Sequence, residues 1–242
     1  MKFPFSISVI IPAFNETENL PNFLEECTQT LSSLTDQFEI IVVDDCSTDT
    51  TQSVLLNLQD TYPNLRIIRN ERNIGCHPST LVGLKAACNE VLIFLPADNQ
   101  IPSGNIPRFL SKINDYDLVC SYRRQRIDNF FRRFASQLYN MLLCFCFGID
   151  LHDTHSAIAV KQEVVKAIAS EIQSPSAFAG CEFILRSLMK GFRVTEIEID
   201  HLPRIHGKAK GANMRDAIRT PLNLMQLFWE VKRKNDRGVI TT

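Results

Sequence analysis

Polar side chains that could bind a ligand fall into four groups in the first half of the sequence. In chain order they are Asn15 and Glu16, which follow Pro12; Asp44 with Asp45, Ser47 and Asp49; Arg69 with Arg72 and Asn73, which precede Gly75; and Asp98 with Gln100. Carboxylate, amide and guanidinium groups bind charged ligands where they converge. Each group also has a structural interpretation, because Ser, Asp and Asn are common helix caps and turn residues.

Basic side chains form two clusters in the second half. The clusters are Arg123, Arg124, Arg126, Arg132 and Arg133, and then Arg204, Lys208, Lys210 and Arg215. Arg132, Ser136 and Asn140 are spaced by four, so on a helix they share one face. An arginine fork on such a face is a good phosphate ligand. The alternative is a solvated helix face with ordinary surface charge.

Each of the four polar groups follows a short apolar run that is typical of a buried strand. The runs are Ile7–Ile11, Glu39–Val43, Leu65–Arg69 and Val91–Leu95. Segments with helical periodicity separate them, and Ser47 or Thr48 is expected to cap the helix that runs toward Tyr62. This alternation predicts an α/β fold with a Rossmann-like, doubly wound, mostly parallel sheet. Ligands bind at the carboxyl ends of such strands, so the polar groups are expected to meet at one edge.

The pattern loosens after Pro102. Further strands are expected at residues 117–121, 156–160 and 194–199, and helices near residues 129–147, 163–170 and 178–190. Residues 203–213 are expected to form a flexible basic loop, and residues 214–234 a C-terminal amphipathic helix. No linker or repeat interrupts the chain, so we expect a single domain over residues 1–242.

Composition narrows the class of protein. A hydrophobic content of 45% is ordinary for a globular chain, and a net charge of −1 gives no support to nucleic-acid binding. The eight cysteines have no metal-binding spacing, and several lie inside apolar runs, where a free cysteine behaves as a small hydrophobic residue. This usage favours a reduced, cytoplasmic compartment. There is no signal-peptide layout and no apolar stretch of roughly 18 residues, so no transmembrane helix is expected.

The order of these motifs resembles glycosyltransferase family 2. The run at residues 11–16, the run Val-Val-Asp-Asp-Cys-Ser-Thr-Asp at residues 42–49, and Asn73 with Gly75 are similar to successive blocks of that family. Pro96-Ala97-Asp98-Asn99-Gln100 stands where the family has its Asp-Ala-Asp-x-Gln motif. The resemblance covers residues 6 to about 213 and implies the GT-A fold.

For the donor, the resemblance implies a nucleotide-sugar-binding half at residues 6–115. The residues it assigns to the nucleoside are Pro12, Asn15, Glu16, one or both of Asp44 and Asp45, and Asn73. A carboxylate there can accept a hydrogen bond from the ring N–H of the base. Asp98 and Gln100 would bind Mg²⁺ or Mn²⁺ between the donor phosphates, because oxygen ligands suit these cations. Pro96 replaces the first acid of the motif, which weakens the expected affinity for metal.

For the acceptor, residues 116–213 resemble dolichyl-phosphate mannosyltransferases and related polyprenyl-phosphate glucosyltransferases, without the C-terminal transmembrane helices that some members carry. The residues implied to bind the acceptor phosphate are Arg123, Arg132, Ser136 and Lys210. Arg204 and Lys210 belong to a His-x-x-Arg-x-x-Gly-x-Ser-Lys closing loop, in which Ala209 replaces the serine. Ala157 and Ile158 replace the usual Gly-Phe pair.

The resemblance implies an inverting transfer of a hexose from a GDP-mannose or UDP-glucose type of donor to polyprenyl or dolichyl phosphate. The expected catalytic residues are Asp98, Asp153 and Arg204. A phosphate acceptor is already ionised and needs no general base, whereas a hydroxyl acceptor would need one, and Asp153 is the candidate. Expected partners are the donor, the lipid acceptor, and a membrane surface or membrane-anchoring protein on the cytoplasmic face.

Three alternatives remain at this point. The first is a family 2 enzyme that uses a soluble, saccharide or other lipid hydroxyl as its acceptor. The second is a nucleotide-sugar-binding protein without turnover, which Pro96 motivates. The third is a nucleotidyltransferase, but the sequence lacks the glycine-rich phosphate loop that this class would need near its N-terminus.

Overall fold

The chain divides into two compact units. The sheet unit comprises Met1–Arg124 and Asp153–Ala209, and the second unit comprises Gln125–His152 and Lys210–Thr242. The computed structural model describes residues 2–123, 143, 151–153, 156–174, 178–203 and 222–230. Each unit is compact in itself, and all the strands of the described chain belong to the sheet unit.

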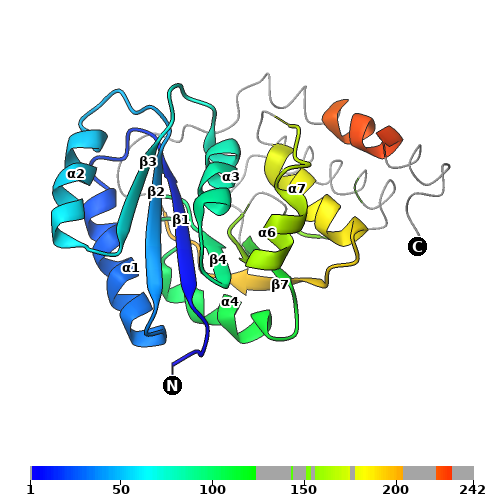
Figure 1. The fold of residues 1–242 in the computed structure, drawn as a ribbon, viewed down its shortest axis with the longest axis horizontal. Helices are drawn as coiled ribbons and strands as arrows, with labels where there is room; N and C mark the ends of the chain where they lie inside the picture. The colour runs from blue at the N-terminus through cyan, green and yellow to red at the C-terminus, as the bar shows by residue number, and fades with distance from the viewer. Residues whose placement is uncertain are drawn as a thin grey trace. The chain divides into compact units, whose positions relative to one another are not determined.

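Seven strands form one sheet in the order β3-β2-β1-β4-β6-β5-β7 (Figure 1). Their bounds are β1 Ile7–Ala13, β2 Phe38–Asp44, β3 Leu65–Arg69, β4 Val91–Phe94, β5 Leu118–Arg123, β6 Ile158–Lys161 and β7 Val194–Ile199. Neighbouring strands are parallel except where β6 pairs antiparallel with β4 and β5. The predicted α/β class with a mostly parallel sheet is therefore confirmed.

The direction of β6 decides which strand ends lie together. Because β6 is antiparallel to both β4 and β5, those two strands point the same way. The carboxyl ends of the parallel strands thus share one edge, and the segment that leads into β6 reaches the same edge. The chain reverses its direction of progress across the sheet between β1 and β4. This switch point is where open α/β sheets bind their ligands.

Helices cover both faces of the sheet. They are α1 Leu20–Leu34, α2 Thr51–Thr61, α3 Cys76–Ala86, α4 Ile106–Ile113, α6 Gln162–Ile168 and α7 Phe178–Met189, with a short 3-10 helix at Ser103–Asn105. Residues of α1, α2 and α4 join one buried cluster with the sheet. The helices α3, α6 and α7 contact one another, and α3 packs on β1 and β2. The sheet is therefore doubly wound.

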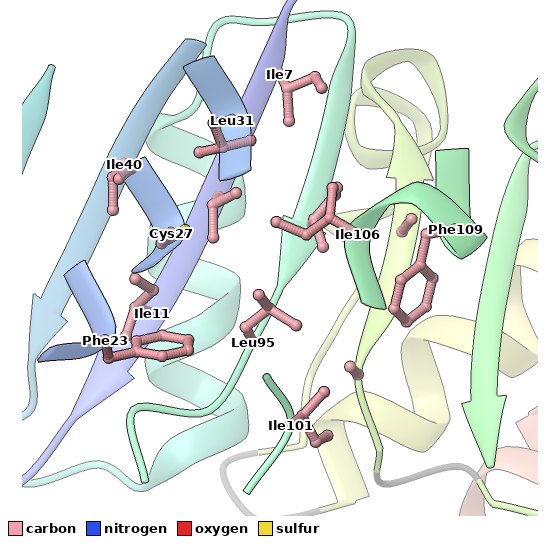
Figure 2. Close-up of a cluster of buried hydrophobic side chains, with 14 of the residues drawn as sticks. Ile7, Ile11, Phe23, Cys27, Leu31, Ile40, Leu95, Ile101, Ile106 and Phe109 are labelled. Carbon is pink, nitrogen blue, oxygen red and sulfur yellow. The ribbon is translucent and has the colours of Figure 1, made fainter. Parts of the chain in front are cut away.

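The main core lies between the sheet and the layer of α1 and α4. Figure 2 shows Phe23, Cys27 and Leu31 of α1 directed toward Ile7 and Ile11 of β1. All five side chains are completely buried. Alternate residues of a strand face opposite sides of the sheet, so the odd-numbered positions of β1 supply this layer.

The opposite face of the sheet is approached most closely at Gly83 of α3. A Cβ atom on this residue would lie 2.4 Å from Cγ2 of Ile10 and 3.1 Å from Cγ2 of Val43. Both neighbours belong to the buried central strands β1 and β2. The missing side chain lets α3 pack against the two strands that lead into the ligand-binding edge.

Most predicted elements match the described ones within a few residues, one prediction is wrong, and another is not tested. The helix α2 begins at Thr51 with Thr50 at its N-cap, so the predicted cap at Ser47 or Thr48 is wrong. The predicted helix at residues 129–147 lies outside the described residues, apart from position 143. Residues 222–230 are helical, within the predicted C-terminal helix. Among the described residues, no helix has the length and apolar character needed to cross a membrane.

Candidate functional site

The loops that follow β1 and β2 hold each other in place. Asn15 has a positive φ of 54°, and its side-chain oxygen accepts a hydrogen bond from the backbone N–H of Thr48 at 2.8 Å. The backbone N–H of Asn15 donates to Oγ of Ser47 at 2.9 Å, and that of Glu16 donates to Oγ1 of Thr51 at 2.9 Å. Ser47 thus connects two loops instead of capping a helix, which is the physical reason for the failed cap prediction.

Asp44 is completely buried, and its charge is compensated within the protein. One carboxylate oxygen accepts the backbone N–H of Ser47 at 2.9 Å, and the other pairs with Nη1 of Arg69. Arg69 lies directly opposite Asp44 in the neighbouring strand β3 and also donates to the carbonyl of Ser47 at 3.2 Å. These contacts fix the turn after β2 and account for the burial of a carboxylate.

Asp45 binds the loop that follows β3. It is 2% exposed, and its Oδ1 accepts hydrogen bonds from Nδ2 of Asn70 and the backbone N–H of Ile74, both at 2.9 Å. Its Oδ2 accepts the backbone N–H of Gly75 at 2.8 Å. Gly75 has a φ of 95°, a conformation that L side chains rarely adopt. Asp45 therefore sets the path of the chain just before α3 begins.

The loop that follows β4 contains the predicted metal motif. The carboxylate of Asp98 accepts the backbone N–H of Gln100 at 3.2 Å, and Asn99 has a positive φ of 58°. The carbonyl of Gln100 accepts the backbone N–H of Leu202 at 2.8 Å. This contact attaches the motif to the segment that follows β7, where the predicted closing loop starts.

The oxygen atoms of this loop suit a hard divalent cation. They come from the carboxylate of Asp98 and from the amides of Asn99 and Gln100, and Oδ1 of Asn99 is buried without a hydrogen-bond partner among the described residues. Across all the residues that the structure describes, no three His, Cys, Asp or Glu side chains form a group that could hold a metal ion by themselves. The residues fit a cation whose remaining ligands come from the oxygens of a bound diphosphate.

Several acidic side chains lie near Cys76, the first residue of α3, at the edge of the sheet where the parallel strands end. Cys76 is exposed at the protein surface, yet the atoms packed around its thiol partly desolvate it, and this desolvation, together with nearby carboxylates, raises its pKa. The carboxylates are those of Asp98, Asp45 and Glu16. The structure thus brings together acids from three of the four groups predicted from the sequence.

A second charged group lies where β5 ends, and it includes Glu196 from the middle of the neighbouring strand β7. Nη2 of Arg123 donates to Oδ2 of Asp153 at 3.1 Å, and the backbone N–H of Asp153 donates to Glu196 at 3.4 Å. Asp153 is 4% exposed. Nε of Arg123 is buried and has no hydrogen-bond partner among the described residues. A guanidinium with an unused donor therefore stands on the same edge as the acidic loops.

Several predicted residues are not described. Arg132, Ser136, Arg204 and Lys210 lie outside the described residues, so their predicted roles remain predictions. Pro12 is described and is buried within β1, opposite Val43. Asn73 is also described and is exposed, in the loop whose path Asp45 sets.

Sequence reasoning missed two residues of the edge. Asn70 contacts both Asp45 and Oγ of Ser79 at 2.9 Å, and Thr51 receives the backbone N–H of Glu16. The signal for Asn70 was its place directly after a predicted strand. Thr51 carried no such signal, because it is the first residue of a helix and its contact spans 35 positions of sequence.

An open α/β sheet with acidic loops at its switch point defines a ligand-binding protein of the doubly wound class. The sequence matches the family described as Glycosyl transferase family 2 over residues 8–169. The chain therefore belongs to glycosyl transferase family 2, as its motifs indicated.

Curated relatives of the chain carry the name undecaprenyl-phosphate 4-deoxy-4-formamido-L-arabinose transferase, and two of them serve as examples. The chain is 31% identical to the protein of Proteus mirabilis over 84% of its own length and 62% of the relative. It is 33% identical to the protein of Pseudomonas fluorescens over 86% of its own length and 61% of the relative. The chain thus spans less than two thirds of the length of these relatives.

Solved structures support the fold. The chain superimposes on glucosyl-3-phosphoglycerate synthase from Mycobacterium tuberculosis, crystallised with Mn²⁺, uridine diphosphate and phosphoglyceric acid, with a TM-score of 0.69. The match covers 91% of this chain and 78% of that chain at 18% sequence identity. A structure of the same synthase with Mg²⁺ and uridine diphosphate gives a TM-score of 0.67 at 16% identity. The GT-A type of fold is shown by this likeness.

Proposed function

We propose that the protein is a glycosyltransferase that moves a sugar from a nucleoside-diphosphate donor to a polyprenyl phosphate. The observation that carries the proposal is the single edge on which acidic loops and Arg123 both lie. The acidic loops suit a donor nucleotide with its cation, and a guanidinium suits an anionic acceptor. The curated relatives are named as transferases of a sugar and undecaprenyl phosphate, which supports the pairing of a sugar donor with a polyprenyl phosphate acceptor.

On the donor side, the protein contributes loops that are already ordered. Asn15, Asp44 and Asp45 fix these loops through hydrogen bonds within the chain. Such preorganisation lowers the entropic cost of binding the nucleotide. Asp98 and Gln100, with Asn99, would hold Mg²⁺ or Mn²⁺, whose charge would offset that of the leaving diphosphate.

On the acceptor side, Arg123 would bind the lipid phosphate through its unused Nε–H and orient it toward the sugar. Asp153 holds the guanidinium through the contact at 3.1 Å. A phosphate oxygen is already ionised, so the reaction needs no proton acceptor and Asp153 can remain a partner of Arg123. Arg132, Ser136, Arg204 and Lys210 would add further contacts to phosphate, as the family resemblance implies.

The experiment is donor profiling with and without polyprenyl phosphate. Release of UDP or GDP is measured from UDP-glucose, GDP-mannose and a UDP-linked 4-deoxy-4-formamido-L-arabinose. We expect one donor to release nucleotide in a manner that depends on polyprenyl phosphate. A hexose donor of the GDP-mannose or UDP-glucose type is the finer proposal, and the formamido sugar is the alternative that the relatives' names suggest.

A variant tests the acceptor site. Arg123→Gln should raise the KM for polyprenyl phosphate roughly tenfold to a hundredfold, because one charged hydrogen bond is worth about 1.5–3 kcal/mol. Nucleotide affinity should stay near that of the parent protein. Arg108→Gln is the matched control, since Arg108 is exposed on α4 and pairs with the exposed Asp200. If no donor transfers sugar to polyprenyl phosphate but one serves a soluble acceptor, the lipid proposal is wrong.

A further inference from the structure

A cavity lies between α3 and α7, two helices that lie side by side (Figure 1). Its wall is mostly apolar and is formed by Leu81 and Leu84 of α3, Phe94 of β4, Ile158 of β6, and Phe183 and Ile184 of α7. Its polar lining comes from His77 and Thr80 of α3 and from Ser156. The volume is about 370 Å³ with the adjoining open space included. The enclosed part therefore suits one substituent of a ligand better than a whole nucleotide sugar.

The polar end of the cavity lies at the ligand-binding edge of the sheet. His77 is in the first turn of α3, directly after Cys76, which is close enough to Asp98 to be affected by its charge. Ser156 belongs to the segment that leads into β6, and this segment reaches the same edge. Leu84, two turns farther along α3, belongs to the apolar end. The cavity thus extends from the edge into the layer between the helices and the sheet.

The imidazole ring of His77 is held in place by two other elements. Its centroid lies 6.1 Å from the ring centroid of Phe94, the last residue of β4. A Cβ atom on Gly180 of α7 would lie 2.6 Å from Nδ1 of His77, so the glycine lets the backbone of α7 approach the ring closely. A side chain that is already held in one position loses little conformational entropy when a ligand binds. His77 is therefore suited to recognise the shape of a ligand group.

The cavity lies between the two halves of the proposed reaction site. On one side, Phe94 is four residues before Asp98, the proposed cation ligand. On the other side, the hydroxyl of Ser156 shares a hydrogen bond of 2.9 Å with that of Ser121, two residues before Arg123 in β5. In the proposed transfer, the bond from the anomeric carbon to the diphosphate breaks as its bond to the acceptor phosphate forms. The sugar must therefore lie between these two groups, next to the polar end of the cavity.

We propose that His77 and Ser156 recognise the substituent at carbon 4 of the transferred sugar and thereby determine which donor the protein accepts. Carbon 4 lies opposite the anomeric carbon in a six-membered sugar ring, so its substituent points away from both phosphates. A neutral imidazole has one donor and one acceptor nitrogen, and a serine oxygen can accept more than one hydrogen bond. A hydroxyl or a small amide group fits this polar end. The inference rests on the proposed function for the positions of the diphosphate and the acceptor.

The cavity wall also contains a position at which the chain departs from its family. Ile158 lines the cavity and stands where the family resemblance has phenylalanine. The larger aromatic side chain would fill part of the space beside Phe94, which is the partner of Ile158 in the sheet. The room that Ile158 leaves near His77 is therefore a feature of this chain, and it offers a second way to change the site.

The test measures the affinity for donors that differ only at carbon 4. The full chain, with Mn²⁺ and without lipid, is titrated in a calorimeter with three pairs of ligands. The pairs are UDP-glucose with UDP-galactose, GDP-mannose with its 4-deoxy analogue, and UDP-4-deoxy-4-formamido-L-arabinose with the pyranose form of UDP-L-arabinose. UDP and GDP alone give the contribution of the nucleotide. We expect the parent protein to prefer one member of at least one pair by about threefold to tenfold, the effect of one hydrogen bond between neutral groups.

Variants assign the preference to the cavity. His77→Phe keeps an aromatic ring beside Phe94 and Gly180 but removes both ring nitrogens, so it should lose the preference and keep the affinity for free nucleotide. Ile158→Phe keeps His77 and narrows the cavity, so it should weaken binding of the preferred donor about threefold to tenfold and leave free nucleotide unaffected. Lys85→Gln is the matched control, because Lys85 is exposed in the last turn of the same helix. It should bind every ligand as the parent protein does.

The inference is overturned if the parent protein binds both members of every pair equally, or if His77→Phe retains the preference. It is also overturned if His77→Phe weakens free nucleotide and nucleotide sugars by the same factor, because the ring would then only support the start of α3. A parent protein that binds neither UDP nor GDP would contradict both the inference and the donor half of the proposed function. No measurement uses polyprenyl phosphate, so a lack of transfer to that acceptor, with the preference intact, would contradict the proposed function alone.

Discussion

Replacing Asp45 distinguishes a carboxylate that touches the nucleotide from one that orders a loop. In Asp45→Ala, the amide of Asn70 and the backbone N–H groups of Ile74 and Gly75 lose their acceptor. Each hydrogen bond to a charged group contributes about 1.5–3 kcal/mol. The three contacts together set an upper limit of roughly 5–9 kcal/mol. The loop can turn toward water in the variant, so we expect a loss of about 3–5 kcal/mol.

The measurement has two parts. Urea unfolding followed by circular dichroism gives the free energy of unfolding, and calorimetry with UDP and GDP gives the nucleotide affinity. We expect both to fall in Asp45→Ala, and Asp45→Asn to recover part of the stability, because its amide oxygen can still accept. Asp49→Ala is the control. Asp49 is exposed and accepts the backbone N–H of Thr51 at 2.9 Å, so its loss should cost about 1 kcal/mol.

Three outcomes would each refute part of the reasoning. If Asp45→Ala unfolds at the urea concentration of the parent protein, its three contacts do not order the loop. If its stability is unchanged and nucleotide affinity alone falls, the carboxylate binds the base directly, as the family resemblance implies. Unchanged affinity for both nucleotides would place the donor elsewhere.

Three further predictions follow from the contacts of the sheet unit. Gly83→Ala should destabilise the protein by at least about 1 kcal/mol in urea unfolding, because its Cβ would meet Ile10 at 2.4 Å, whereas Gly104→Ala has open space and should not. Hydrogen bonds from the Arg193 side chain, from Lys161 and from the Arg193 backbone outweigh desolvation and hold the pKa of Asp117 well below its usual range. The stability that the Asp117 carboxylate contributes is therefore present above about pH 4 and is lost as the pH falls. Asp117→Asn should lower the free energy of unfolding at neutral pH, and its difference from the parent protein should shrink in acid. Asp98→Ala should abolish transfer with the fold intact, and Pro96→Asp should lower the Mg²⁺ or Mn²⁺ concentration needed for half-maximal activity. Full activity of Asp98→Ala, or no effect of EDTA on the parent protein, would argue against a catalytic metal.

The sequence predicted the sheet well because its signals are local. Buried parallel strands appear as short continuous apolar runs, and the run predicted at Val91–Leu95 matches the fully buried strand β4, Val91–Phe94. The core stripe of α1 was also predictable, because Leu24, Cys27 and Leu31 follow helical spacing and are buried. The antiparallel direction of β6 was not predictable in this way. An apolar run has no direction, so only the pairing with β4 and β5 reveals it.

The gathering of acids at one edge was predictable, but their hydrogen-bond partners were not. Strand ends of a parallel sheet share an edge whatever their sequence, which placed Asp45 and Asp98 near each other. The partners of Asp45 lie 25 to 30 positions away in the chain. Their contacts depend on the path of a loop that contains Gly75 at positive φ, and sequence spacing carries no information about that path.

Asp44 and Asp45 at the ligand-binding edge form charge-compensating contacts within the protein, and these contacts affect how the edge can bind an anionic nucleotide. A nucleoside diphosphate carries negative charge, so uncompensated carboxylates near it would repel it. Asp44 is paired with Arg69, and Asp45 accepts three hydrogen bonds, so both charges are stabilised before any ligand arrives. Asp98 differs, because it lies in the loop whose amide oxygens suit a cation, and Pro96 removes a second acid from that loop. An edge built in this way should bind the diphosphate more tightly with Mg²⁺ or Mn²⁺ than without, yet should retain measurable affinity for UDP or GDP in EDTA.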